Sequence, residues 1–176
     1  MRMDTPPVRD LVLLGGGHSH VQVLKSFAMK PLPGVRLTVV SREVLTPYSG
    51  MLPGHVAGFY TQRDMHIDLG PLARVAGARL IADEVTALDL GAGQVSLADH
   101  PPLRFDRLSI NTGAVPNGVA GSGIPVKPIG RFLPRWQAVK ASARPGDTLA
   151  LIGGGAGGVE LALAMARSVT DGVQIL

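Results

Sequence analysis

The sequence predicts an α/β fold with two β-α-β units and a set of short antiparallel strands between them. Two glycine-rich turns, at 15–17 and 153–158, each follow a short apolar run and open a stretch with helical spacing. From Ala78 to Ile110 the pattern changes to short strands separated by turn residues. Parallel strands are joined through helices. A glycine turn between a strand and a helix, found near each end of the chain, therefore favours the α/β class.

The first unit is the more complete of the two. Its predicted elements are, in order, strand 11–14, helix 21–29 stopped by prolines, strand 35–40, loop-rich segment 41–63, and a short helix 68–76. Asp68 is a candidate N-cap for that last helix.

The rest of the chain is predicted to hold a β-meander and then a second unit. Its predicted elements are strands 79–81, 85–90, 94–97 and 105–110, a turn-rich crossover 114–128, helix 131–143, strand 148–152, helix 156–168, and the first residues of a strand at 173–176. The first β-α-β unit runs from Gly15 to Ser41, and a unit of the same length starting at Gly153 would end beyond Leu176. We therefore expect the chain to be a fragment of a longer protein.

The glycine spacing points to dinucleotide binding. In such a turn the first glycine permits the tight bend, the second lets a pyrophosphate approach the backbone, and the third lets the helix pack on the strand. The second turn has all three, at Gly153, Gly155 and Gly158. In the first turn His20 stands at the third position, and we expect its bulk to push the helix off the strand.

Composition excludes several classes. The net charge is +4 with no run of Lys or Arg, which disfavours nucleic-acid binding. With no cysteine, the chain can hold neither a disulfide nor a thiolate metal site. His18 and His20 diverge at a helix start with no third ligand nearby, so no metal site is predicted. The chain has neither a signal peptide nor an apolar run of about 20 residues, so we expect a cytoplasmic protein.

These motifs resemble a known family. The order of GGGHSH turn, meander, Asn-Thr-Gly-Ala, linker and GGGAGGVE is similar to FAD-dependent pyridine nucleotide-disulfide oxidoreductases, most of all the type II NADH dehydrogenase branch. PYSGMLPG and GGGHSH further resemble the flavoprotein module fused to selenide, water dikinase. The resemblance implies an FAD-binding Rossmann-like domain at 1–115, a linker at 116–145, and the truncated start of an NAD(P)H-binding Rossmann-like domain at 146–176.

The resemblance also implies roles for particular residues. The residues implied to hold FAD are Gly15, Gly16, Gly17, His18, Ser19 and His20 at the pyrophosphate, Ser41 and Arg42 near the adenosine ribose, Val85 at the adenine, Thr112 and Gly113 in the return towards the flavin, and Pro47, Tyr48, Ser49 and Gly50 near its ring. The residues implied to hold NAD(P)H are Gly153, Gly155, Ala156, Gly157 and Gly158. Glu160 resembles the glutamate that faces the nicotinamide–flavin contact, the catalytic position.

Some of these residues also have a purely structural explanation. Ser41 lacks the charge of the usual acidic residue, and Glu43 is a substitute two positions late. The position of Tyr48 is explained equally well by packing of its ring. The presence of Glu160 is explained equally well by the favourable interaction of a negative charge with a helix start.

The resemblance implies hydride transfer from NAD(P)H to flavin, then electron transfer to a small-molecule acceptor. A quinone fits the first branch, and a selenium or sulfur compound fits the second. The alternative is a non-catalytic FAD- or NAD-binding module that serves a fused partner. For the full-length parent we keep open a homo-oligomer and a peripheral contact with the inner face of the membrane, whereas for this chain alone we expect little or no activity.

Overall fold

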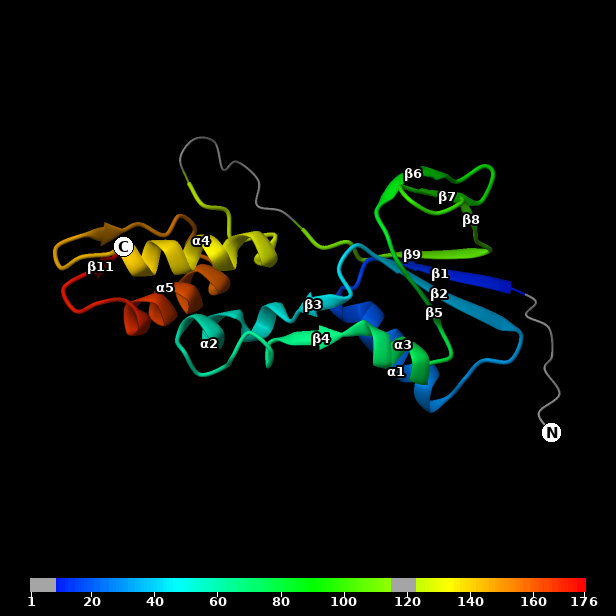
Figure 1. Ribbon diagram of the computed structural model, residues 1–176, viewed down its shortest axis with the longest axis horizontal. Helices are drawn as coiled ribbons and strands as arrows, with labels where there is room; N and C mark the ends of the chain where they lie inside the picture. Colours follow the sequence, from blue (N-terminus) through cyan, green and yellow to red (C-terminus); the bar gives the residue numbers. More distant parts are fainter. Residues whose placement is uncertain (1–8, 115–122) are drawn as a thin grey trace. The chain divides into compact units, whose positions relative to one another are not determined.

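The computed structural model describes residues 9–114 and 123–176, which form two compact units (Figure 1). The first unit contains residues 9–46 and Asp68–Gly113. The second contains Pro47–Ile67 and the described residues from Ala114 onward. This division differs from the expected domain boundaries, because residues 47–67 and the expected linker helix both pack with the C-terminal elements. Residues 115–122 of the expected linker lie outside the described residues.

A parallel sheet forms the centre of the first unit. Its strands lie in the order β5-β2-β1-β9. The elements of this sheet and its helices are β1 (Arg9–Leu14), α1 (His18–Met29), β2 (Val35–Ser41), α3 (Leu69–Val75), β5 (Arg79–Ala82) and β9 (Arg107–Ile110). The predicted β-α-β unit is therefore confirmed, and α1 begins at His18, directly after the glycine turn.

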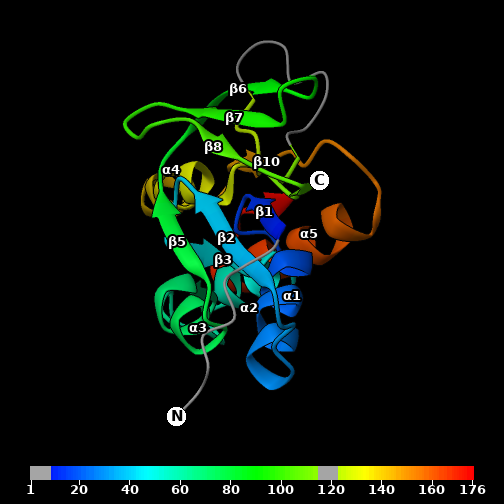
Figure 2. The same ribbon diagram turned by 90° about the vertical axis from the view of Figure 1, so that its right-hand side faces the viewer.

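The two faces of this sheet are covered by different elements. Helices α1 and α3 cover one face, and the antiparallel strands β6 (Val85–Asp89), β7 (Gln94–Leu97) and β8 (Leu103–Arg104) cover the other (Figures 1 and 2). The core beneath the antiparallel strands comprises Val12, Leu14, Val40, Ile81, Val95 and Leu97. Since side chains alternate along a strand, Leu13 and Val39 lie on the opposite face, where they are fully buried.

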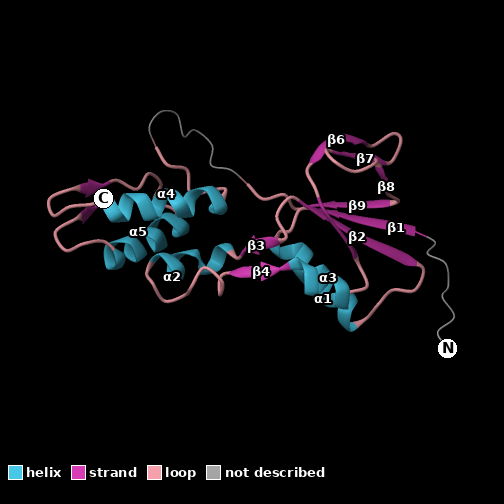
Figure 3. Ribbon diagram, viewed as in Figure 1, coloured by secondary structure: helices cyan, strands magenta, loops and turns pink. Residues whose placement is uncertain are grey.

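The described part of the second unit contains three α-helices and one short 3-10 helix (Figure 3). The elements of this unit are η1 (Ser49–Met51), α2 (Leu52–Val56), α4 (Ile129–Ser142), β10 (Thr148–Leu149), α5 (Ala156–Ser168) and β11 (Gln174–Ile175). Their shared core comprises Leu52, Val56, Met65, Ile129, Phe132, Leu133, Trp136, Leu161, Ala164 and Met165.

Predictions for the second unit are confirmed unevenly. Helix α5 has the predicted bounds, and α4 lies within two residues of its predicted bounds. The prediction of a strand over 148–152 is wrong beyond Leu149: the Leu151 N–H still donates to the Leu176 carbonyl at 2.6 Å, but the strand itself ends at Leu149 and Ile152 is 98% exposed.

Two short paired strands carry the chain out of the first unit and back. β3 (Leu45–Pro47) leaves it and β4 (His66–Asp68) returns. These strands, η1 and α2 are too short to show a period, so the sequence predicted only loop over 41–63. The predicted cap at Asp68 is confirmed, since its carboxylate accepts a hydrogen bond from the Gly70 N–H at 2.8 Å. Within the described ranges, no helix is both long and apolar enough to cross a membrane.

Candidate functional site

The first glycine turn has the backbone that a dinucleotide turn requires. Gly15 lies in the left-handed region at φ 94°, and Gly17 is an extended N-cap at φ −67°, ψ 168°. A Cβ on Gly15 would lie well inside 3.0 Å of the Asn111 carbonyl and 2.8 Å from the Cα of Thr112. Only glycine therefore allows β1 to turn into α1 beneath the end of β9.

The second glycine turn repeats this geometry. Gly153 is left-handed at φ 123°, and Gly155 is the extended N-cap of α5 at φ −73°, ψ 169°. A Cβ on Gly158 would collide with the Gly153 carbonyl, far inside 3.0 Å. The third glycine is thus required by close packing of the helix start against the turn.

Both helix starts fit a pyrophosphate. Neither α1 nor α5 has a side-chain cap or an acidic residue in its first turn. The first N–H groups of such a helix have no partner within the helix and carry the positive end of its dipole. At the second turn, a Cβ on Gly153, Gly154, Gly155 or Gly157 would meet none of the described residues within 4 Å, which leaves room for an approaching phosphate.

The first turn is more closely surrounded. A Cβ on Gly16 would lie 2.8 Å from Leu69 and 3.1 Å from the hydroxyl of Ser41, and one on Gly17 would collide with the side chain of Asn111. The glycines here therefore serve packing within the first unit as well as any approach of a ligand to the backbone.

His20 is buried rather than splayed out of the turn. It is 1% exposed, and its Nδ1 lies 2.7 Å from the Gly15 carbonyl oxygen while its Nε2 lies 2.9 Å from Ser109 Oγ. Because a carbonyl oxygen only accepts, the hydrogen-bond network assigns the proton to Nδ1. The imidazole therefore bridges the glycine turn and strand β9.

Ser41 reaches the first turn from the end of β2. It is 7% exposed, and its hydroxyl donates to the Glu43 carbonyl at 2.8 Å. The structure therefore brings Ser41 beside Gly16, with its hydroxyl proton donated to its own chain. Arg42, next to it, is exposed.

Asn111 begins the Asn-Thr-Gly-Ala motif, but the sequence indicated no role of its own for it. Its backbone N–H donates to Leu14 O at 2.8 Å, and its side-chain Nδ2 donates to Ser19 Oγ at 2.6 Å. It thereby joins the end of β9 to the start of α1. Thr112 and Gly113, which the resemblance did indicate, follow directly, with Gly113 left-handed at φ 87°.

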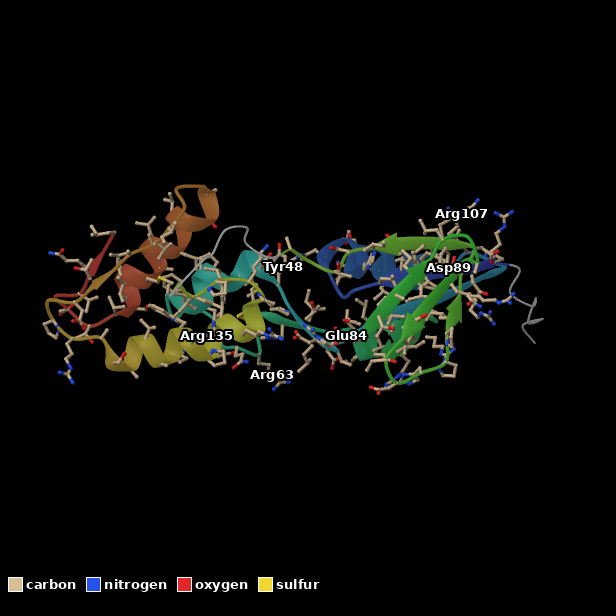
Figure 4. All side chains as sticks on the ribbon, turned by 90° about the horizontal axis from the view of Figure 1, so that it is seen from above. Tyr48, Arg63, Glu84, Asp89, Arg107 and Arg135 are labelled. Atoms are coloured by element: carbon tan, nitrogen blue, oxygen red, sulfur yellow. The ribbon has the colours of Figure 1, made fainter. Side chains whose placement is uncertain are left out.

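A buried carboxylate supports the backbone leading to Val85. The Asp83 side chain is 1% exposed and accepts hydrogen bonds from the N–H groups of Glu84 (2.6 Å) and Asp99 (3.1 Å) and from His100 Nδ1 (2.7 Å). Burial acts to raise the pKa of Asp83, but the bonds from His100 and the two N–H groups outweigh it and leave that pKa below its ordinary value. Glu84 is labelled in Figure 4.

The remaining candidate residues lie in the second unit. The segment 47–50 passes from β3 into η1, and the Tyr48 N–H donates to Met65 O at 2.7 Å. Tyr48, labelled in Figure 4, is 43% exposed. Its ring lies 3.2 Å from where a Gly50 Cβ would be. Glu160 is exposed on α5, beyond its first turn.

A family comparison identifies the class. Residues 9–176 match the family described as pyridine nucleotide-disulphide oxidoreductase, so the chain belongs to that family, whose members use FAD and NAD(P)H. The α/β class predicted from the glycine turns is thereby confirmed.

Two named relatives are similar to this chain. One is the probable ferredoxin reductase CtmF of Castellaniella defragrans, 27% identical over 157 residues, which cover 86% of this chain and 38% of the relative. The other is the ferredoxin–NAD(+) reductase component of the biphenyl dioxygenase system of Paraburkholderia xenovorans, 36% identical over 94 residues, or 52% of this chain and 23% of the relative. The chain thus spans well under half the length of either relative.

Solved structures support the fold. The covalent putidaredoxin reductase–putidaredoxin complex has a TM-score of 0.75 at 21% identity, over 96% of this chain and 42% of that one. NDH2 from Plasmodium falciparum in complex with NADH has a TM-score of 0.68 at 17% identity, over 90% and 37%. The narrower placement in the NADH dehydrogenase branch therefore stays a prediction, since the named relatives are ferredoxin reductases.

Proposed function

We propose that this chain is part of an FAD-dependent NAD(P)H oxidoreductase that passes electrons to a separate acceptor. The observation that carries the proposal is the repeated turn, with left-handed Gly15 and Gly153, extended N-caps Gly17 and Gly155, and helix starts without a side-chain cap. Two such anion-binding ends in one chain suit two dinucleotides. FAD, when bound, supplies the hydride and electron chemistry, while the protein orients and encloses the two cofactors.

The proposed roles follow the two turns. The start of α1 would hold the FAD pyrophosphate, with Ser41 at the ribose and the Val85 backbone at the adenine. The start of α5 would hold the NAD(P)H pyrophosphate, and Glu160 on the same helix is the proposed residue at the nicotinamide–flavin contact. The segment 47–50 and Thr112-Gly113 remain proposed flavin contacts.

Two relatives named as ferredoxin reductases make a ferredoxin the first acceptor to test. A quinone is the second, by the resemblance to the NADH dehydrogenase branch, and a selenium or sulfur compound is the third.

The test is spectroscopic. We expect the full-length parent protein to carry flavin absorbance, which NADH or NADPH bleaches under anaerobic conditions and which a suitable acceptor restores. Flavin that neither nucleotide reduces would contradict the oxidoreductase and favour the second candidate, a non-catalytic FAD-binding module. This second candidate is supported by the first turn, which has His20 in place of the third glycine and Ser41 in place of the usual acidic residue.

A further inference from the structure

His20 occupies the third-glycine position of the first turn. The proposed function assigns no role to its side chain. The second turn shows what that position does. There Gly158 packs so tightly on the Gly153 carbonyl that no Cβ would fit, and this contact fixes the direction of the carbonyl. In the first turn the equivalent carbonyl belongs to Gly15, and it accepts a hydrogen bond from His20 at 2.7 Å.

We propose that His20 is a positioning residue for the cofactor turn, which holds the Gly15 carbonyl by a hydrogen bond where Gly158 holds Gly153 by close contact. The inference rests on the proposed function of this turn as the FAD pyrophosphate site. It assigns a role to a residue that otherwise counts as a departure from the glycine motif.

The geometry of the peptide gives the reason that this matters. In a trans peptide the C=O and the following N–H point in opposite directions. Because His20 holds the Gly15 carbonyl on its own side, the N–H of Gly16 is directed away from the imidazole. A donor fixed before the ligand arrives costs no ordering on binding, which favours affinity for an anion.

The other ring nitrogen fixes the imidazole itself. Ser109 lies on β9, the strand beside β1, and its hydroxyl is 2.9 Å from His20 Nε2. A ring protonated at Nδ1 donates to Gly15 and accepts from Ser109 at the same time, so both of its polar atoms are satisfied while it is buried. The turn, helix α1 and strand β9 are thereby tied together through one side chain.

The test compares two amides that each mimic half of the imidazole. The nitrogen of asparagine lies near the position of Nδ1, whereas glutamine reaches the position of Nε2. We expect H20N to bind FAD within about threefold of the wild-type affinity, and H20Q and H20G to lose about tenfold, the usual effect of one buried hydrogen bond. The result for H20G is the sharper one, because that variant restores the glycine motif.

Leu24→Ala is the matched control. Leu24 is fully buried on the same helix but has no part in the turn, so its variant is expected to lose stability while FAD affinity stays within about twofold of wild type. A second readout needs no FAD: the ¹⁵N shifts of the His20 ring should show a proton on Nδ1 and none on Nε2.

The outcomes separate this inference from the proposed function. A wild-type protein that binds no FAD contradicts the proposed site, and the inference with it. A wild type that binds FAD, with H20Q or H20G binding as tightly, contradicts the inference alone. So does a His20 ring that carries its proton on Nε2.

Discussion

Gly157 and Gly158 are neighbours in the first turn of α5, but their surroundings differ. A Cβ on Gly157 would meet nothing within 4 Å, whereas one on Gly158 would collide with the Gly153 carbonyl. Sequence alone gives both the same residue type, so the distinction comes from the packing of the helix start on its own turn.

This difference predicts opposite effects of the same substitution. Gly158→Ala should lower the free energy of unfolding by about 1–3 kcal/mol through overpacking. Gly157→Ala should leave it unchanged or raise it by up to about 1 kcal/mol, because alanine is the better helix former. Urea denaturation of both variants measures this, and equal losses would contradict the close approach at Gly158.

The buried carboxylate of Asp83 predicts a dependence of stability on pH. Its pKa is lowered in the folded protein, so the stabilisation is complete above the ordinary aspartate pKa of about 3.9 and is lost as pH falls through the lower folded value. Asp83→Asn should therefore lower the unfolding temperature at pH 7 and narrow its gap to wild type below about pH 4.

Asp171→Asn is the control for that experiment, since Asp171 is exposed in the turn before β11. Its unfolding temperature should follow wild type across the same range. A gap between Asp83→Asn and wild type that stays constant down to pH 2 would show that the carboxylate charge is not what stabilises this loop.

At the scale of elements, α4 belongs to a core rather than to a linker. Its apolar side Ile129, Phe132, Leu133 and Trp136 is buried among residues of α2 and α5. Arg135, on the same helix, is exposed (Figure 4).

Trp136→Ala should accordingly cost about 3–5 kcal/mol in the unfolding of the second unit, as expected for a large buried side chain. Gln137→Ala, at the exposed neighbouring position, should change it by less than about 0.5 kcal/mol. Guanidinium denaturation of both variants, followed by circular dichroism, measures this difference. In Gln137→Ala, tryptophan fluorescence gives a second measurement of unfolding. Equal stability of the two variants would mean that α4 does not support this core.

Elements with strong local signals were predictable from the sequence. The bounds of α5 and the cap at Asp68 followed from helical spacing, glycine and a capping carboxylate. The strands β3 and β4 were not, because each is only three residues long and is defined by its partner. The same applies to the site. The glycine turns were recognisable from their spacing, whereas the contacts of His20 with Ser109 and of Asn111 with Ser19 were not predictable, because they join residues far apart in the chain.

At the scale of the whole molecule, the two turns of the full-length parent should be separable by mutation. Gly15→Ala should release flavin, because its Cβ would collide with the Asn111 carbonyl and its backbone is left-handed. Gly153→Ala should keep flavin but weaken its reduction by NAD(P)H, because it forces alanine into a left-handed backbone that costs about 1–2 kcal/mol. Absorbance spectra before and after addition of nucleotide measure both effects.

Gly146→Ala is matched for strain, since Gly146 has the same φ of 94° as Gly15 and a Cβ there meets nothing within 4 Å. It should retain flavin and its reduction. Loss of flavin in this variant too would show that the effect of Gly15→Ala comes from general destabilisation.

The excursion of the chain through β3 and back through β4 has a consequence for biosynthesis. Leu52, Val56 and Met65 emerge from the ribosome long before Ile129 and Leu161, with which they share a core. Until those later helices are made, this apolar segment has no partner from its own unit. Pairings so distant along the chain close slowly, so the second unit should be the later one to fold and the one that depends more on chaperones during synthesis.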